Sequence, residues 1–461
     1  MEINKYMFRE YDIRGVYGRD ITDDVAYLIG KAFGTKLRRY GKTKTLVGYD
    51  NRYSSPALEK KLVQGIRECG VDVVRLGLVT TPMYYYGWDL LDIHCGVMVT
   101  ASHNPKDDNG FKFSYNGIHN AYGSSSMDLY DLIIRNDFFI ASKKGSVSNY
   151  DIKNEYIDMI TKAVDLGDRK LKVIYDCGNG TTSVVADELF SRFSDKLELV
   201  PLFSTSDSSF PNHHPDPAVE ENLSILKEKV KELKADVGIA FDGDGDRIGI
   251  IDNEGKFVPI DNFMILIWKY LAKGQVKKET FYDVKCSLAL KEELDKLGVD
   301  SFWYRTGNSY TKAKSAEGDY PFSGEFSGHV FFRDKFNGYD DGIYGGLRLV
   351  EILSHTDETI TDMLKGISHY EASPELKIAV SDDVKFELVD KIKEYCENKK
   401  YNLLLIDGVK VFFDDGSALV RVSNTGPNLT TRFEARSKER LEEIQKEFLD
   451  KIDGLKKDLE K

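Results

Sequence analysis

The sequence predicts a multidomain α/β protein, and three observations support this fold class. The chain has 461 residues, which is too long for one ordinary core and suggests about three domains from length alone. Strand-like and helix-like segments alternate as far as about residue 368, which is typical of largely parallel sheets covered by helices. The remainder has an α+β order instead. We expect domains at residues 1–147, 148–252, 253–368 and 369–461.

The first domain is expected to begin with a capped helix. Thr22 is suited to cap a helix that carries apolar residues at helical spacing from Val25 to Phe33. Pro56 is suited to the first turn of a second helix. The expected strands are residues 45–49, 71–76 and 96–100, the last of which ends at a polar loop.

The second and third domains repeat this alternation after a polar stretch at residues 142–150. The second should contain a strand at 171–175, a turn at 177–180, a helix from about 183, a charged helix at 220–234 and a strand at 237–241. The third should contain a helix after Asp261, a strand at 281–284 and a loop-rich region at 323–346.

The last domain should combine strands and helices without the βαβ order. Its expected elements are a strand at 378–380, an amphipathic helix at 384–396, strands near 403 and at 409–413, and a charged helix after Ser437.

Composition narrows the class of protein. Hydrophobic residues make up 41% and charged residues 30% of the chain, as in globular proteins. The net charge of −12 argues against a general nucleic-acid binder. The N-terminus lacks a signal-peptide core, and the longest apolar run, at residues 263–268, is too short to span a bilayer. The five scattered cysteines favour neither a disulfide framework nor a zinc site, so we expect a cytoplasmic protein.

The most informative motif is D-G-D-G-D-R at residues 242–247, directly after an apolar run. Asp242, Asp244 and Asp246 alternate with glycines, so their carboxylates can project to one side of the backbone. Three adjacent like charges repel unless a cation lies among them, and hard oxygen ligands suit Mg²⁺ or Ca²⁺. Arg247 is suited to phosphate. A surface turn is the alternative; an EF-hand is excluded because its sixth and twelfth positions hold Arg247 and Asn253.

A second motif, T-A-S-H-N-P at residues 100–105, follows an expected strand, where ligand sites collect in α/β folds. Ser102 could carry a phosphoryl group and so divide a transfer into two steps. Lys112 could stabilise charge or move a proton. The alternative is a polar turn ended by Pro105, in which His103 only holds the loop.

Two later loops carry groups suited to sugars and phosphates. G-E-F-S-G-H at residues 324–329 offers a carboxylate, a hydroxyl and an imidazole as partners for sugar hydroxyl groups. R-V-S-N-T-G-P at residues 421–427 offers a guanidinium, hydroxyls and turn residues that can surround a phosphate. Either could be an ordinary structural loop. Weaker signals lie around Tyr11 and Arg14, around Lys285 and at residues 305–308.

These four motifs, in this order and at domain-scale separations, resemble those of the α-D-phosphohexomutases, most closely the bacterial and archaeal phosphomannomutase/phosphoglucomutase branch. The resemblance spans nearly the whole chain. It implies three α/β domains with mixed sheets and a C-terminal α+β, TATA-binding-protein-like domain around a central cleft. In chain order these domains would bear the phosphoserine, bind the metal, recognise the sugar and bind the phosphate.

The resemblance also implies roles for individual residues. Ser102 would be the phosphoserine, and one Mg²⁺ per chain would be held by Asp242, Asp244, Asp246 and the Ser102 phosphate. The catalytic groups would be Ser102, Lys112, Arg247 and His329. Substrate would contact Tyr11, Arg14, Lys285, Glu325, Ser327, His329, Arg421, Ser423, Asn424 and Thr425.

The implied reaction is reversible transfer of a phosphoryl group between C1 and C6 of mannose or glucose phosphates. It would pass through phosphoserine and a 1,6-bisphosphate, which would also serve as activator. Alternatives are a phosphoglucosamine mutase, a phosphatase or bisphosphate synthase, and a non-catalytic sugar-phosphate-binding protein. No nucleic-acid or membrane partner is expected, and the protein would be a monomer or homodimer. Many relatives have His where this chain has Asn308. Asn cannot titrate near neutral pH, which favours Lys112 as acid or base, with His329 as the alternative.

Overall fold

The computed structural model describes residues 3–423 and 426–459, which form two compact units. Unit 1 comprises the chain up to Ile260 together with Asn308–Phe322 and Ser327–Met363. Unit 2 comprises Asp261–Gly307, Ser323–Phe326 and the chain from Leu364. The domain boundaries expected from the sequence stay a prediction.

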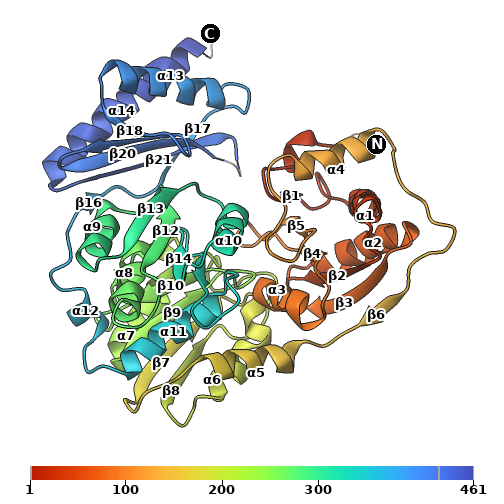
Figure 1. Cartoon of the computed structure of the whole chain (residues 1–461), viewed down its shortest axis with the longest axis horizontal. Coiled ribbons are helices and arrows are strands. Elements are labelled where there is room, and N and C mark those ends of the chain that lie inside the picture. The colour runs from red at the N-terminus through yellow and green to blue at the C-terminus, as the bar shows by residue number, and fades with distance from the viewer. Residues whose placement is uncertain (1–2, 424–425, 460–461) are drawn as a thin grey trace. The chain divides into compact units, whose positions relative to one another are not determined.

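The first sheet of unit 1 is mixed, with the order β1-β5-β4-β2-β3-β6 (red to orange in Figure 1). Strands β4, β2, β3 and β6 are parallel, whereas β1 and β5 pair antiparallel at one edge. The strands are β1 (Ile13–Val16), β2 (Lys44–Tyr49), β3 (Asp72–Leu78), β4 (Gly96–Val99), β5 (Asp108–Ser114) and β6 (Val147–Asn149). The expected strands at β2, β3 and β4 are therefore present, but the polar stretch at 142–150 contributes β6 rather than only a linker.

Four helices belong to this sheet: α1 (Asp23–Arg39), α2 (Ser55–Glu68), α3 (Thr81–Leu90) and α4 (Ser125–Ile134). The predicted cap of α1 is formed, because Thr22 Oγ1 accepts a hydrogen bond from the Val25 amide at 3.3 Å. Helices α1 and α2 approach so closely that a Cβ atom at Gly30 would lie 2.1 Å from the Leu62 carbonyl oxygen. This contact requires glycine at residue 30.

The second sheet of unit 1 has the order β11-β10-β9-β7-β8. Strands β8, β7 and β9 are parallel, and β10 and β11 continue the sheet antiparallel. Its strands are β7 (Leu171–Asp176), β8 (Leu197–Leu202), β9 (Val237–Phe241), β10 (Ile248–Ile251) and β11 (Phe257–Val258). The remaining elements of unit 1 are α5 (Lys153–Ala163), α6 (Ala186–Ser191), α7 (Ser224–Leu233), α10 (Asn308–Glu317), β15 (Val330–Phe332), α11 (Gly342–Ser354) and α12 (Ile360–Met363).

Two expectations about this region need correction. The helices predicted from about residue 183 and over 220–234 each begin with a 3₁₀ turn, at Thr181–Val184 and Glu220–Leu223. The region predicted to be loop-rich also contains the start of α11, which packs against β7, β9 and β10. Strand β15 was not predicted, because a strand of three residues in a glycine-rich segment has almost no periodic pattern.

Unit 2 contains parallel strands β12 (Glu279–Asp283) and β13 (Asp300–Tyr304), and β14 (Phe322–Gly324) pairs with β12. Helices α8 (Ile260–Leu271) and α9 (Leu288–Lys296) accompany them. A second sheet has the order β16-β21-β20-β19-β18, with β17 also paired to β21. These strands are β16 (Glu371–Ala372), β17 (Leu376–Ala379), β18 (Asn402–Leu404), β19 (Val409–Phe413), β20 (Gly416–Val422) and β21 (Asn428–Ala435).

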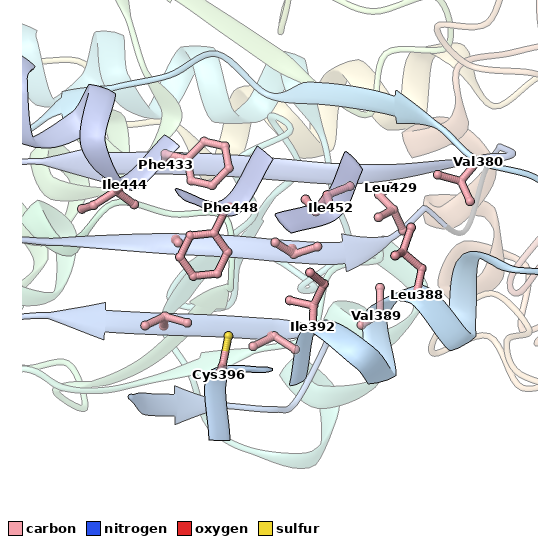
Figure 2. Packing of buried hydrophobic residues seen from close by; sticks show 14 of the residues in the cluster. Val380, Leu388, Val389, Ile392, Cys396, Leu429, Phe433, Ile444, Phe448 and Ile452 are labelled. Atoms are coloured by element: carbon pink, nitrogen blue, oxygen red, sulfur yellow. The ribbon is translucent and has the colours of Figure 1, made fainter. Parts of the chain in front are cut away.

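Two helices, α13 (Lys385–Asn398) and α14 (Lys438–Leu459), cover this last sheet. Figure 2 shows Leu388 and Ile392 of α13 together with Ile444 and Phe448 of α14 against the sheet. The ring centroids of Phe433 and Phe448 lie 6.2 Å apart. This is the α+β arrangement expected from the sequence. Arg421, expected in a loop, lies on β20 instead.

Two further observations concern the described part of the chain. Its helices include none with the length and apolar character needed to cross a bilayer. All five cysteines are buried and free, as expected for small apolar core residues.

Candidate active site

An acidic turn follows strand β9 in unit 1. Asp242, Asp244 and Asp246 are completely buried, at 0% exposure each. Asp242 Oδ1 accepts hydrogen bonds from the amides of Gly245 (3.0 Å) and Arg247 (3.1 Å), which closes the turn. One oxygen from each carboxyl group lies within 4.8 Å of the others. The spacing in the sequence therefore does bring the three carboxyl groups to one point.

One lysine partly neutralises this cluster, and two threonines donate hydrogen bonds to it. Lys112 Nζ donates to Asp244 (2.8 Å) and Asp246 (2.6 Å). Thr81 and Thr100 donate to the same Asp244 oxygen at 2.6 Å and 3.1 Å. Strand β5 thus supplies Lys112, the start of helix α3 supplies Thr81, and Thr100 directly follows β4.

Burial and the neighbouring charges shift the pKa values of the three aspartates and of Lys112. Burial, with the charges of Asp244 and Asp246, raises the pKa of Asp242 well above its usual range. Burial also opposes ionisation of Asp244 and Asp246, but Lys112 overcomes it and holds the pKa of both below the ordinary value. Burial likewise lowers the pKa of Lys112, yet the two carboxylates raise it beyond its ordinary value. Lys112 therefore keeps its proton in this arrangement.

Ser102 lies against the acidic cluster. Its Oγ donates to Asp242 Oδ2 at 2.7 Å and lies 3.2 Å from His103 Nδ1. The Ser102 loop and the Asp turn approach so closely that a Cβ atom at Gly243 would lie 2.5 Å from the Ser102 carbonyl oxygen. Residues 140 positions apart thus form one site, as the sequence predicted.

The acidic cluster could bind a divalent cation. Among the described residues, Asp244 Oδ1 and Asp246 Oδ1 are buried and have no hydrogen-bond partner, although buried polar atoms are normally satisfied. Both are hard oxygen donors of the kind that Mg²⁺ and Ca²⁺ prefer. The donor set therefore fits a cation that would satisfy these oxygens.

A second network of polar side chains lies beside the acidic cluster. Arg247 Nε donates to His329 Nε2 at 2.9 Å, so His329 carries its proton on Nδ1, which lies 2.7 Å from Asp340 Oδ2. Lys312 Nζ lies 3.0 Å from the other Asp340 oxygen. Asn308 Nδ2 donates to Asp340 at 3.3 Å. The Nε2 atom of His329 is thus an acceptor held in a fixed direction.

Three more predicted residues belong to unit 1. Arg14 lies on β1 and donates to Asp12 (2.7 Å) and to Asn104 of the Ser102 loop (2.6 Å). Tyr11 is half-buried in the bend before β1, and Ser327 is half-buried in the turn before β15. The structure thus brings Arg14 to the Ser102 loop.

Unit 2 carries the other predicted residues. Glu325 is buried and accepts from the Gly307 amide at 3.1 Å. Lys285 Nζ lies 3.1 Å from Glu375, whose pKa it lowers to about 2. Arg421 pairs with Asp407 at 2.9 Å. Ser423 is buried, and its carbonyl oxygen accepts from Lys385 at 3.2 Å.

Asn424 and Thr425 lie outside the described residues. The sequence also missed several residues of the site, namely Thr81, Thr100, Lys312 and Asp340. Thr100 belongs to a recognised motif, but the other three stand in segments with no pattern of their own.

The chain belongs to the phosphoglucomutase/phosphomannomutase family. The family's models of α/β/α domains I, II and III match residues 5–138, 154–255 and 259–370, and its C-terminal domain matches residues 375–451. The phosphomannomutase/phosphoglucomutase of Pseudomonas putida is 40% identical over 442 residues, which cover 96% of this chain and 94% of that protein. A phosphoglucomutase of Neisseria meningitidis is 36% identical, with 97% and 96% covered.

A solved structure is similar as well. A phosphoglucomutase/phosphomannomutase family protein from Burkholderia thailandensis has a TM-score of 0.90 and 37% identity, with 98% of each chain covered. The fold class expected from the sequence is confirmed by these matches.

Proposed function

We propose that this chain is a phosphomannomutase/phosphoglucomutase that moves a phosphoryl group between C1 and C6 of a hexose phosphate. One observation carries the proposal: Ser102 Oγ lies 2.7 Å from Asp242, inside the buried acidic cluster. A hydroxyl that can accept and return a phosphoryl group thus lies beside the ligands for a charge-neutralising cation. The names of the relatives at 40% and 36% identity support this activity.

Mg²⁺ is the cation that we propose, one per chain, held by Asp242, Asp244, Asp246 and the phosphate on Ser102. When bound, Mg²⁺ would offset the negative charge of the phosphoryl group during transfer. The unpartnered oxygens of Asp244 and Asp246 support this assignment.

The residues of unit 1 would carry the transfer. The P–O bond to Ser102 breaks as a new P–O bond forms to the free sugar hydroxyl, whose proton passes to a base. His329 would take this proton on Nε2 once Arg247, which donates to that atom, turns to the phosphoryl group, whereas Lys112 keeps its proton between two carboxylates. Lys112 and Arg247 would instead stabilise negative charge. The sugar bisphosphate then returns its other phosphoryl group to Ser102, so a hexose 1,6-bisphosphate can also activate the enzyme.

The remaining predicted residues would bind the substrate. Glu325 and Ser327 would contact sugar hydroxyl groups. Arg421 and Ser423, together with Lys285, would bind the phosphate that is not being transferred, because cations and hydroxyls recognise phosphate well. Asn424 and Thr425 would share this role, and Tyr11 and Arg14 would contact substrate near Ser102. Asn308 has no acid–base role in this scheme, since an amide does not titrate near neutral pH.

The direct test is a mutase assay with Mg²⁺ and a trace of glucose 1,6-bisphosphate, run in parallel on glucose, mannose and glucosamine 1-phosphates. We expect isomerisation of the first two and, after Ser102→Ala, a loss of at least about 10³-fold in kcat because covalent transfer is no longer possible. Ser126→Ala is the matched control, since Ser126 is equally buried in the same sheet's helix α4.

The alternatives give different results in the same assay. Turnover of glucosamine phosphate alone would identify a phosphoglucosamine mutase. Released phosphate or accumulated bisphosphate would identify a phosphatase or a bisphosphate synthase. Binding of glucose 6-phosphate without any turnover would leave a sugar-phosphate-binding protein and would refute the proposed function.

A further inference from the structure

Arg52 is a buried arginine beside the Ser102 loop, and no sequence motif drew attention to it. It follows strand β2 and is only 1% exposed. Nη2 donates to the carbonyl oxygens of Ser102 (2.8 Å) and Asn104 (2.6 Å). Nη1 donates to those of Pro105 (2.6 Å) and Asp108 (2.9 Å). One guanidinium group therefore binds four carbonyl groups of a single loop.

Other hydrogen bonds also hold this loop, among them those that Arg14 donates to Ala101 and Asn104. Within it, the amides of Asn104 and Asp108 donate to the carbonyls of Ala101 and Pro105, both at 3.0 Å. Pro105 itself has no amide proton to donate. The carbonyl groups of Ser102, Asn104 and Asp108 accept from Arg52, and a buried carbonyl without a donor is costly.

The backbone of Ser102 needs such support. Its φ angle is +52°, in the left-handed region that residues with a side chain rarely adopt. A conformation of this kind is unfavourable by about 1–3 kcal/mol and persists only where the surroundings fix it. The hydrogen bond from Arg52 to the Ser102 carbonyl fixes the peptide directly after this residue.

Arg52 is itself held in place. Asp50 Oδ1 accepts from the Arg52 amide (3.1 Å) and from Ser55 Oγ (2.5 Å), and Asp50 Oδ2 lies 3.3 Å from Arg52 Nε. Asn109 of strand β5 donates to Ser55 Oγ at 2.9 Å. The buried Asp50–Arg52 pair of the loop after β2 thus holds in place the guanidinium group that binds the loop after β4.

We propose that Arg52 is a positioning residue for phosphoryl transfer. It holds Ser102 in the left-handed conformation that directs Oγ at Asp242, and it does so through backbone carbonyl groups without touching a reacting atom. This inference rests on the proposed function. In this role Arg52 sets the direction from which Ser102 Oγ meets the phosphoryl group, and it does not bind substrate.

The test is Arg52→Lys, which keeps the charge but loses the planar fork of donors. We expect kcat to fall about 10²-fold, since a displacement near 1 Å has effects of this size, while KM for glucose 1-phosphate stays within twofold. Phosphorylation of Ser102 by glucose 1,6-bisphosphate, followed by intact-protein mass spectrometry in a single turnover, should slow by the same factor. In Arg52→Ala, added guanidinium at millimolar concentration should restore part of the rate.

Arg348→Lys is the matched control. Arg348 is 0% exposed and forms a two-bond pair with Asp334 at 3.0 and 2.7 Å, on helix α11 of the same unit. We expect this variant to lose stability, but the folded fraction should keep its kcat. Amide hydrogen exchange gives a readout independent of activity. The amides of residues 101–110 should exchange faster in Arg52→Lys than in the wild type, and at the wild-type rate in Arg348→Lys.

Several results would overturn the proposal. These are an unchanged kcat, a rise in KM alone, or unaltered exchange over residues 101–110 in Arg52→Lys. If that variant does not fold, Asp50→Asn takes its place, and a fall of about tenfold in kcat with constant KM is expected from the loss of the charged partner; an unchanged kcat would refute the inference. Wild-type mutase activity tests the proposed function separately, so the two failures are distinguishable.

Discussion

Three buried carboxyl groups share a single lysine at the candidate site. Asp244 and Asp246 have Lys112 as counter-charge, while Asp242 accepts hydrogen bonds from Ser102 and from the amides of Gly245 and Arg247. Burying several like charges with too few cations is unfavourable in a medium of low dielectric constant. A bound cation would therefore offset the remaining negative charge at this site.

Removal of metal should accordingly affect both activity and stability. We expect EDTA to abolish turnover and Mg²⁺ to restore it, and we expect Mg²⁺ to raise Tm because it binds the folded state alone. Asp244→Asn should lose most of the Mg²⁺-dependent rise in Tm, measured by scanning calorimetry at several Mg²⁺ concentrations. Asp195→Asn, at an exposed position, should respond like the wild type. An equal rise in Asp244→Asn would show that the cation binds elsewhere.

Asp341 gives a prediction about pH. It caps helix α11 by accepting from the Tyr344 amide at 2.9 Å and also accepts from Tyr156 Oη at 2.7 Å. Burial raises its pKa to about 7. A folded-state pKa above the unfolded one means that this group's contribution to stability is complete at low pH and is lost as the pH rises toward 7.

Asp341→Asn should remove this pH dependence while keeping the cap, because Asn is an equally good N-cap residue. Between pH 5 and pH 8 the wild type should lose about 3 kcal/mol of stability that the variant does not lose. The measurement is Tm at both pH values, with Asp195→Asn as control. Parallel Tm–pH curves for wild type and Asp341→Asn would contradict the assignment.

Replacing a helical glycine by alanine should have opposite effects on stability at a closely packed position and at an exposed one. A Cβ atom at Gly30 of α1 would clash with the α2 backbone, whereas one at Gly454 of α14 would meet no atom of the described residues within 4 Å. We expect Gly30→Ala to destabilise unit 1 by about 1–3 kcal/mol. Gly454→Ala should stabilise unit 2 by about 0.5–1 kcal/mol. Calorimetry of both variants checks this, and shifts of the same sign would show that the contact distances do not control stability.

Long elements with a clear period were predictable from the sequence, and short ones were not. The helices after Thr22, near residues 384–396 and after residue 437 have strong amphipathic patterns. Thr22 is also a typical capping residue. Strands β1 and β6 have four and three residues and lie at sheet edges, where little apolar pattern is needed. β20 and β21 adjoin a polar motif, which obscured both strands.

Some residues of the candidate site were likewise predictable from the sequence, and others were not. The chemistry of the three aspartates is readable from their spacing, whereas the role of Ser102 follows only from the resemblance of its motif to those of a known family. Arg52, Thr81 and Asp340 act through contacts with residues distant in sequence, and nothing in their immediate neighbours indicates this. Such residues become visible only when the fold shows which carbonyl or carboxyl group each one meets.

For the complete chain, the C-terminal segment has a core of its own. The buried cluster that contains Leu388, Val411, Phe433 and Phe448 draws all its members from residues 376–459. We expect residues 370–461 alone to fold with a cooperative thermal transition, monitored by circular dichroism. Phe433→Ala should abolish or strongly lower that transition, since such truncations in a core are unfavourable by about 3–5 kcal/mol. A fragment without a cooperative transition would show that this core needs the rest of unit 2.

The path of the chain has a consequence for synthesis on the ribosome. Unit 1 is interrupted after Ile260 and again between Phe322 and Ser327, and it is completed only at Met363. A nascent polypeptide that has emerged as far as residue 260 already holds Ser102 and all three aspartates, yet still lacks helix α11, which covers β7, β9 and β10. Until that helix emerges, apolar faces of these strands stay open to water, so this is the stage of translation at which chaperone binding would matter most.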